Sequence, residues 1–489
     1  MRRFRIGRVA ARWKNFLPPI QGGTYRLLAD GDQDSDQEDC EEESSSLSSS
    51  SPESPLFDRA DEDKGRAGFR HRITGASDNS SISSASTDDL PAVDVAKKIS
   101  HMDVVTQRAI DLDVAKYPSL DHQTQDEITR KYRLLYRRIE AEGLFHCNYW
   151  AYLLESCRYL CLFVLFLITL RSGWFGASGL FLGLLWHQLV FTVHDAGHMG
   201  ITHDFQTDTI IGILIADFIG GLSLGWWKRN HNVHHIVTNS PEHDPDIEHM
   251  PFFAISHRFF KSLKSTYYER VMTYDSMARF MVRYQSYLYY PIMLFGRFNL
   301  YRLSWEFLIR GQGPRKGPAR WHRWFEISGQ VFFWFWFGYL VMYKSIPTTG
   351  GRLLFLLVSH MATAPLHVQI TLSHFAMSTA DLGIDESFAQ KMLRTTMDVD
   401  CPPWLDFLHG GLQHQAIHHL YPRIPRHNLR TTQKLVQEFC HDVGIPYALY
   451  GFVDGNKEVI SRLAEVGRQA AILAECQRTI SQSQQLHVH

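Results

Sequence analysis

Four long apolar runs stand out along the chain, and each is long enough to form a helix that crosses a lipid bilayer. A helix needs about 20 predominantly apolar residues to span the hydrocarbon core. The runs predict spans at residues 149–170, 174–193, 325–346 and 353–377. Short connections join the first two spans into one hairpin and the last two into another. The pattern therefore predicts an all-α integral membrane protein with four transmembrane helices and a helical cap.

Basic residues flank the first predicted span on one side. Before it stand Arg130, Lys131, Arg133, Arg137 and Arg138, whereas the loop after it offers only Arg171. The positive-inside rule therefore places the N-terminus in the cytosol. Four spans return the chain to the side where it started, so we expect both termini and the helical cap on the cytosolic face.

Two further segments are apolar but do not read as simple spans. Thr207–Trp227 is apolar enough to cross the membrane. A crossing would, however, put the histidines at 194–198 and those at 231–235 on opposite faces of the membrane. We therefore predict a re-entrant or surface-lying helix there. Tyr284–Phe307 is rich in aromatic residues but interrupted by Pro291 and by charged residues. Because Trp and Tyr favour the membrane interface, we predict an interfacial position for this segment.

The two ends of the chain differ in composition from its apolar centre. Residues 1–125 begin with the basic strip Arg2–Lys14, continue through the Asp/Glu/Ser-rich stretch Asp30–Ser54, and show little apolar periodicity. Such a segment buries too little surface to offset the entropy of ordering, so we predict disorder. The basic strip is either a membrane-surface anchor or a solvated tail. We assign residues 126–455 to a membrane domain and 456–489 to a C-terminal helical tail.

Overall composition excludes several classes of partner and fold. The formal net charge is −1, which gives no indication of a nucleic-acid partner. Seven cysteines are scattered without a CxxC pair. This odd number and wide spacing argue against a disulfide framework and are typical of a reducing, cytosol-facing environment.

Three histidine clusters lie at the edges of the apolar segments. The first holds His194 and His198, the second holds His231, His234 and His235, and the third holds Gln415, His418 and His419. On a helix, spacings of three and four residues place the members of a cluster on one face. Neighbouring imidazoles can share an iron, zinc or copper ion, and the lack of carboxylates disfavours Mg²⁺ or Ca²⁺. Because the clusters offer more imidazoles than one tetrahedral zinc uses, they indicate two metal ions.

The fourth predicted span carries histidines of its own. His360, His367 and His374 recur every seven residues, which keeps them near one helix face with about 20° of drift per step. His374, at the cytosolic end, is the candidate for an additional metal ligand. His360 lies about 20 Å deeper, so we expect it to pack or to hydrogen-bond to a neighbouring helix. We expect the same of His187 in the second span.

In their order and spacing, the HxxxH, HxxHH and QxxHH clusters resemble those of the membrane fatty-acyl desaturases. The glutamine form of the third cluster resembles the front-end group of that family. Thr395–Arg430 is especially similar to sphingolipid Δ8-desaturases, and the resemblance runs from about Asp126 to Phe452 with support at Asp244–Ile247. It implies an oxygen-dependent oxidoreductase of the endoplasmic reticulum with two non-haem iron ions. The implied ligands are His194, His198, His231, His234, His235, His374, His418 and His419.

Two positions in the third cluster are less certain as ligands. Gln415 stands at its first position, and an amide is a poorer metal donor than an imidazole. It is a candidate ligand that could also act through water or from outside the coordination shell. His414 departs from the family pattern, because relatives have an aromatic residue there.

The electron supply departs from the front-end pattern. Those relatives carry an N-terminal cytochrome b5 domain with a His-Pro-Gly-Gly motif, whereas this chain has no His-Pro dipeptide and only His71 in its first 100 residues. We therefore expect no haem in this chain and expect a separate cytochrome b5 and its reductase to donate electrons. Phe4–Gly23 looks like the segment that follows the fused domain in relatives. The alternative that the sequence starts after a fused cytochrome b5 domain therefore stays open.

The resemblance implies a Δ8 double bond placed in the long-chain base of ceramide. One alternative is a front-end fatty-acid desaturase that acts on an acyl thioester or phospholipid, and another is a lipid hydroxylase with the same site. A transition-metal transporter is a more distant alternative. It would require histidines along a path through the membrane, whereas the clusters are predicted to meet at one face.

Overall fold

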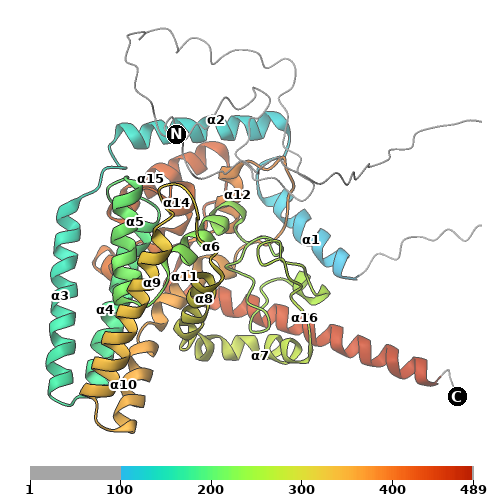
Figure 1. The fold of residues 1–489 in the computed structure, drawn as a ribbon. Helices are drawn as coiled ribbons and strands as arrows, with labels where there is room; N and C mark the ends of the chain where they lie inside the picture. The colour runs from blue at the N-terminus through green and yellow to red at the C-terminus, as the bar shows by residue number, and fades with distance from the viewer. Residues whose placement is uncertain (1–100, 487–489) are drawn as a thin grey trace, which may run out of the picture.

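The computed structural model describes residues 101–486, and this part of the chain is mostly helical. Figure 1 shows the arrangement of its elements. The predicted disorder of residues 1–100, with the strip Arg2–Lys14, lies outside the described residues. The prediction that disorder continues to residue 125 is wrong, because α1 (His101–Lys116) and the start of α2 (His122–Ala141) are helical. Contacts with the rest of the fold stabilise α1, since Thr106 hydrogen-bonds His257 at 2.8 Å.

Three helical segments are long and apolar enough to cross a membrane. They are α3 (Tyr149–Arg171), α4 (Phe175–Gly197), and the pair α10 (Thr349–Met361) and α11 (Ala364–Phe375), which together cover Thr349–Phe375. The predicted span 325–346 is also helical, as α9 (His322–Phe333) continuing into the π-helix η4 (Trp334–Ser345). α3, α4, α9 and α10 lie close together at one side of the molecule in Figure 1.

Close contact between α4 and α10 depends on two glycines of α4. A Cβ added at Gly179 would lie 2.8 Å from the carbonyl oxygen of Phe355, and one added at Gly183 would collide with that of Ser359. This is the small-residue packing by which membrane helices bring their backbones together. The sequence G-L-F-L-G therefore fixes how the second and the last candidate spans meet.

The segment predicted to be re-entrant is sharply bent. α5 (Phe205–Ile213) and the π-helix η2 (Leu214–Ile219) are followed by α6 (Leu224–Val237) at 118°, so the pair is either a broken span or a re-entrant loop. The buried start of α6 is capped by carboxylates, because Asp217 accepts from the Leu224 N–H at 3.2 Å and Glu326 from the Gly225 N–H at 3.0 Å. These bonds satisfy N–H groups that the start of a helix leaves without intrahelical partners, so the bend is stabilised from inside.

The remaining elements form a region, called the cap here, that lies over one end of the candidate spans and beside them in Figure 1. It contains η3 (His257–Lys261), α7 (Ser276–Met293), α8 (Gly296–Arg310), α12 (Phe388–Thr395), η5 (Pro403–Leu405), α13 (Asp406–His409), η6 (Leu412–His414), α14 (Gln415–Leu420) and α15 (Arg426–Val443). A short parallel pair, β1 (Asp398–Asp400) and β2 (Leu449–Gly451), completes it. Amphipathic α2 buries Ile128, Leu135 and Ile139 against this cap.

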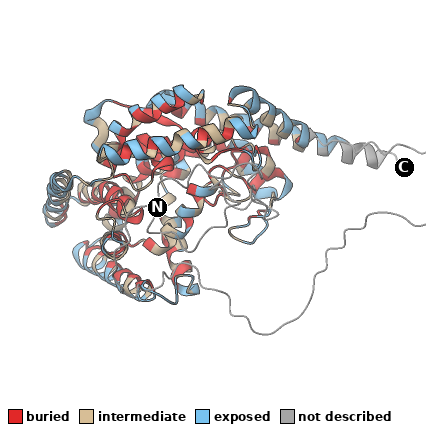
Figure 2. Ribbon diagram, turned by 90° about the horizontal axis from the view of Figure 1, so that it is seen from above, coloured by how far each residue is buried: buried red, intermediate tan, exposed pale blue. Residues whose placement is uncertain are grey.

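The last helix, α16 (Phe452–Leu486), is only partly a tail. Val459, Leu463 and Val466 are buried in the same core cluster as Val282 of α7. The prediction of a tail from residue 456 is therefore wrong for the first half of this helix. In Figure 2 the helix then continues beyond the body of the molecule, where Ile472 is exposed.

Candidate metal centre

All three histidine clusters lie on helices or helix ends, as their spacing predicts. His194 belongs to the last turn of α4 and His198 is its C-cap residue. The second cluster lies on α6, whose N-terminal cap is Ser223, and the third lies on the short α14. His374 belongs to the last turn of α11. Helices from distant parts of the chain therefore present imidazoles to one region of the cap.

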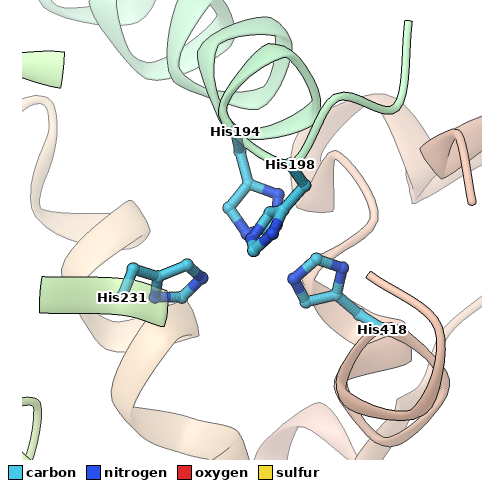
Figure 3. Close-up of side chains that lie close together, drawn as sticks. All are labelled: His194, His198, His231 and His418. Carbon is cyan, nitrogen blue, oxygen red and sulfur yellow. The ribbon is translucent and has the colours of Figure 1, made fainter. Parts of the chain in front are cut away.

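The first group of possible ligands contains four histidines. The nitrogens of His194, His198, His231 and His418 all lie within 4.8 Å of one another. Figure 3 shows two of them coming from α4 and the other two from α6 and α14. The ring centroids of His194 and His418 are 4.4 Å apart. This arrangement suits one metal ion bound by imidazoles.

A second group lies next to the first. The nitrogens of His234, His374 and His419 also lie within 4.8 Å of one another. The ring of His235 lies between the groups, 4.7 Å from that of His198 and 4.2 Å from that of His419. His374, the candidate added from the fourth predicted span, thus lies with the second and third clusters. Two adjacent sets of imidazoles match the expectation of two ions, although their role as ligands stays a prediction.

Partners outside the clusters orient these rings. Nδ1 of His234 donates to Asp244 at 2.9 Å, and Nδ1 of His231 lies 3.4 Å from Asp246. Thr238 donates its proton to the His234 carbonyl at 2.6 Å, so it accepts from Nδ1 of His419 at 3.1 Å. In His234 and His419 these bonds leave the Nε2 lone pair for a metal, whereas Nε2 of His231 lies 3.1 Å from Nε2 of His235. Asp244 and Asp246, which belong to the Asp244–Ile247 segment that supported the family resemblance, thus orient the rings of His234 and His231.

Unpartnered nitrogen atoms test whether the site fits a metal. Nε2 of His198, His418 and His419, and Nδ1 of His235 and His374, are buried without a hydrogen-bond partner among the described residues. Buried polar atoms normally have partners, so such a concentration fits a bound cation. Burial also lowers the pKa of His418 and of His419 well below the usual value, with neighbouring histidines adding to the effect. The neutral imidazole that a metal requires is therefore the stable form.

Four other histidines and glutamines singled out in the sequence have different surroundings. Gln415 is buried, and its Oε1 has no hydrogen-bond partner among the described residues, so its role stays open. His414 is buried with Nδ1 at 3.8 Å from Asp398 and does not join a group. The expectation for His360 is confirmed, because Nε2 accepts from Tyr301 of α8 at 3.2 Å. His187 packs edge-on against Phe191.

A buried charge network behind the first group was not predicted from the sequence. Arg426, at the start of α15, pairs with Glu155 of α3 and with Asp195, which lies between the two histidines of the first cluster. Tyr152 also donates to Asp195. Glu155 lies inside the protein, where it contacts both Arg426 and His427. The only sequence signal for this charge network was Glu155, a carboxylate within an apolar run.

Comparison with known proteins gives consistent similarities over most of the chain. The profile of the fatty acid desaturase family matches residues 172–451. A Delta 8-(E)-sphingolipid desaturase of Emericella nidulans is 64% identical over 480 residues, which cover 98% of this chain and 85% of that protein. A protein of the same name from Komagataella phaffii is 48% identical over 485 residues, covering 98% and 84%. A Delta(8)-fatty-acid desaturase of Helianthus annuus is 37% identical over 367 residues, covering 72% and 76%.

Proposed function

This chain belongs to the fatty acid desaturase family, and we propose that it introduces a trans Δ8 double bond into the long-chain base of a sphingolipid, with ceramide as substrate. The substrate and the position follow the names of relatives that match nearly the whole chain. The observation that carries the chemistry is the pair of adjacent, buried imidazole groups with unpartnered nitrogens. Together they support an oxidoreductase that acts on a lipid chain.

Two iron ions fit these groups. His194, His198, His231 and His418 would hold one, and His234, His374 and His419 the other, with His235 between them. Gln415 is the remaining candidate, directly or through water. When bound, the irons supply the O₂ chemistry that removes hydrogen from unactivated C–H bonds of a lipid.

The protein's own residues hold the rings and keep water away. Asp244 and Thr238 fix the tautomers of His234 and His419, so that each ring presents the same nitrogen inward. The rings of His198, His234 and His419 are buried, which leaves a site of low polarity for a C–H bond. Holding one pair of carbons against such a site lowers the entropic cost of bringing the reacting groups together. It also selects the position of the double bond.

The membrane arrangement that we propose has four spans in two hairpins, with both termini and the metal centre on the cytosolic side of the endoplasmic reticulum. Three candidate spans support it, and we propose that the helix α9–η4 supplies the fourth over residues 325–346, with the bent pair α5–η2 and α6 as a re-entrant segment. We propose a separate cytochrome b5 and its reductase as electron donors. Turnover by purified protein in vesicles should then require both, and turnover with the reductase alone would overturn this assignment.

Lipid profiling of a host that lacks Δ8 desaturation tests the function. We expect hosts expressing the chain to accumulate Δ8-unsaturated long-chain bases, and hosts expressing a His418→Ala variant to accumulate none. Unsaturated fatty acyl chains without changed long-chain bases would favour the fatty-acid alternative. A hydroxylated long-chain base would favour the hydroxylase alternative. Exchangeable zinc in place of two firmly held irons would favour a transporter.

A further inference from the structure

A cavity of about 370 Å³ lies beside the C-terminal end of α6, on the side away from the metal centre. Val233, Ile236 and Val237 of α6 form an apolar wall. The loop that follows α6, residues 266–267, residues 379–381 and Lys391 of α12 complete the lining. Small-molecule sites have this size and this mixture of apolar walls with a few polar groups.

The polar groups of the cavity include both donors and acceptors. Lys391 forms no ion pair with any described residue, and burial lowers its pKa even though Glu386 and Asp381 act in the opposite direction. Asn239 is 1% exposed, and its Oδ1 has no hydrogen-bond partner in the described part of the chain. A buried amide oxygen without a partner costs free energy unless a ligand or water donates to it.

Two lining residues connect the cavity to the metal centre. Thr238, the first residue after α6, lines the cavity and hydrogen-bonds Nδ1 of His419 at 3.1 Å. Asn239 donates from Nδ2 to the backbone carbonyl of His374 at 2.8 Å. The cavity and the second histidine group therefore meet where α6 ends.

We propose that this cavity binds the polar end of the substrate, a neutral lipid head that carries hydroxyl and amide groups. The inference rests on the proposed function and names the part of the protein that recognises its substrate. Lys391 donates to a hydroxyl, and the oxygens of Asn239 and Asp381 accept from the hydroxyl and amide protons of the head. The alkyl chain passes the end of α6 at Thr238 toward the histidines.

The charges of the cavity favour a neutral head over the alternatives. Burial lowers the pKa of Lys391 and Asp381 acts against this effect, so the lining holds one basic and one acidic side chain near each other. A thioester of a phosphate-bearing carrier would need several cations, whereas the lining contributes one lysine and His243. A cationic head would meet Lys391. Hydroxyl and amide groups suit this balanced set of donors and acceptors.

The dimensions also agree with a Δ8 position. Thr238 and Asn239 form the layer of side chains between the cavity and the second histidine group, and a chain that passes this layer beside α6 covers roughly 5–12 Å, the radius to the diameter of a helix with its side chains. In a long-chain base, about seven C–C bonds of about 1.5 Å separate the hydroxylated end from the eighth carbon, a zigzag of about 9 Å. A head held in the cavity therefore brings the eighth and ninth carbons to the region of the irons.

Steady-state kinetics with ceramide in vesicles test the proposal. Lys391→Met removes the cation, and Ile236→Trp fills the cavity from its exposed wall. We expect the KM for ceramide to rise about tenfold in Lys391→Met, the size expected for losing a hydrogen bond to a charged group, and to rise at least as much in Ile236→Trp because the indole occupies the space of the head, with kcat and iron content retained in both. Matched controls are Lys457→Met and Ile472→Trp on exposed positions of α16, which should behave as the unsubstituted protein does.

A truncated ceramide whose long-chain base ends before its eighth carbon provides a direct probe of the head. It should inhibit the unsubstituted enzyme competitively and lose at least tenfold in inhibition constant with either cavity variant. An unchanged KM and an unchanged inhibition constant in both variants would overturn the head-group site, as would a fall in kcat alone. Neither result touches the proposed function, which fails only if the unsubstituted protein forms no Δ8 product from ceramide.

Discussion

Replacing Arg426 with methionine should destabilise the metal centre without touching a histidine. The side chain is 4% exposed, and its guanidinium donates to the Phe191 carbonyl at 3.1 Å and to Thr192 at 3.2 Å. It also pairs with Asp195 and Glu155. Burial opposes its charge, but these carboxylates raise the pKa of Arg426 above its usual value, so the side chain is cationic.

Loss of one partner of a buried ion pair costs about 3–5 kcal/mol, because the other charge stays buried without compensation. Here two carboxylates lose their cation. Tyr152 still donates to Asp195, and Tyr159 and His427 still contact Glu155. These remaining donors should limit the loss in free energy of unfolding to the lower end of that range, about 3 kcal/mol. A methionine of similar length fills the volume, so the effect reports charge and hydrogen bonding more than a cavity.

The assay compares detergent-solubilised variants by thermal unfolding, iron content and turnover. At about 2 °C per kcal/mol for a large domain, we expect the Tm of Arg426→Met to fall on the order of 6 °C. Iron content should fall with it, because Asp195 is adjacent to His194. Arg426→Lys keeps the charge but loses the planar guanidinium that contacts two carboxylates. Its Tm and iron content should therefore lie between those of Arg426→Met and those of the unsubstituted protein.

Arg430, one turn later on α15, provides the matched control. It pairs with Asp406 at a side-chain exposure of 32%, and exposed pairs contribute about 0–1 kcal/mol. Arg430→Met should therefore keep nearly the original Tm and iron content. The reasoning is refuted if Arg426→Met matches Arg430→Met in both measurements, because the buried network would then hold neither the fold nor the first histidine group.

Three further predictions address the ligands, the span packing and the pH dependence. His234→Ala should abolish Δ8 product in lipid profiles while membrane insertion, measured by carbonate extraction, is retained; full activity would remove His234 from the ligand set. Gly183→Leu should prevent α4 from packing on α10 and lower the yield of monodisperse protein, whereas Gly176→Ala, whose Cβ meets only a side chain at 3.5 Å, should be tolerated. Burial raises the pKa of Glu248 to about 8, so ionisation in the unfolded chain from its ordinary pKa of 4.5 destabilises the fold as pH rises toward 8. Glu248→Gln should thus gain Tm over the unsubstituted protein from pH 6 to pH 9, and a constant difference across this range would contradict the assignment.

Local patterns predicted the parts of the fold that depend on local sequence. Apolar length alone identified α3 and α4, and the spacing of three and four residues placed the histidines on helix faces. The bend before α6 was visible only as an ambiguity. Its cause is a contact with Glu326, about 100 residues away, and no local pattern reports such a pairing.

The site shows the same division between spacing and tertiary contact. Seven-residue spacing singled out His374, and the structure places it beside His234 and His419. Arg426 was not predicted as part of the site, because its partners come from the first two candidate spans and an arginine after the third cluster has no distinctive pattern. The helix from residue 101 was missed because a polar helix that packs on a distant loop lacks the apolar periodicity that reveals buried helices.

These long-range contacts explain why the metal centre cannot be assigned to the cap alone. Arg426 ties the segment after the third cluster to Glu155 of α3 and to Asp195 of α4. Gly179 and Gly183 of α4 then fix the same helix against α10, which leads into α11 and His374. A displacement of either candidate span would therefore move a histidine of one group relative to the other. In the function that we propose, both imidazole groups act on a single lipid carbon pair, so the packing of the spans would set the geometry of the reaction as directly as the histidines do.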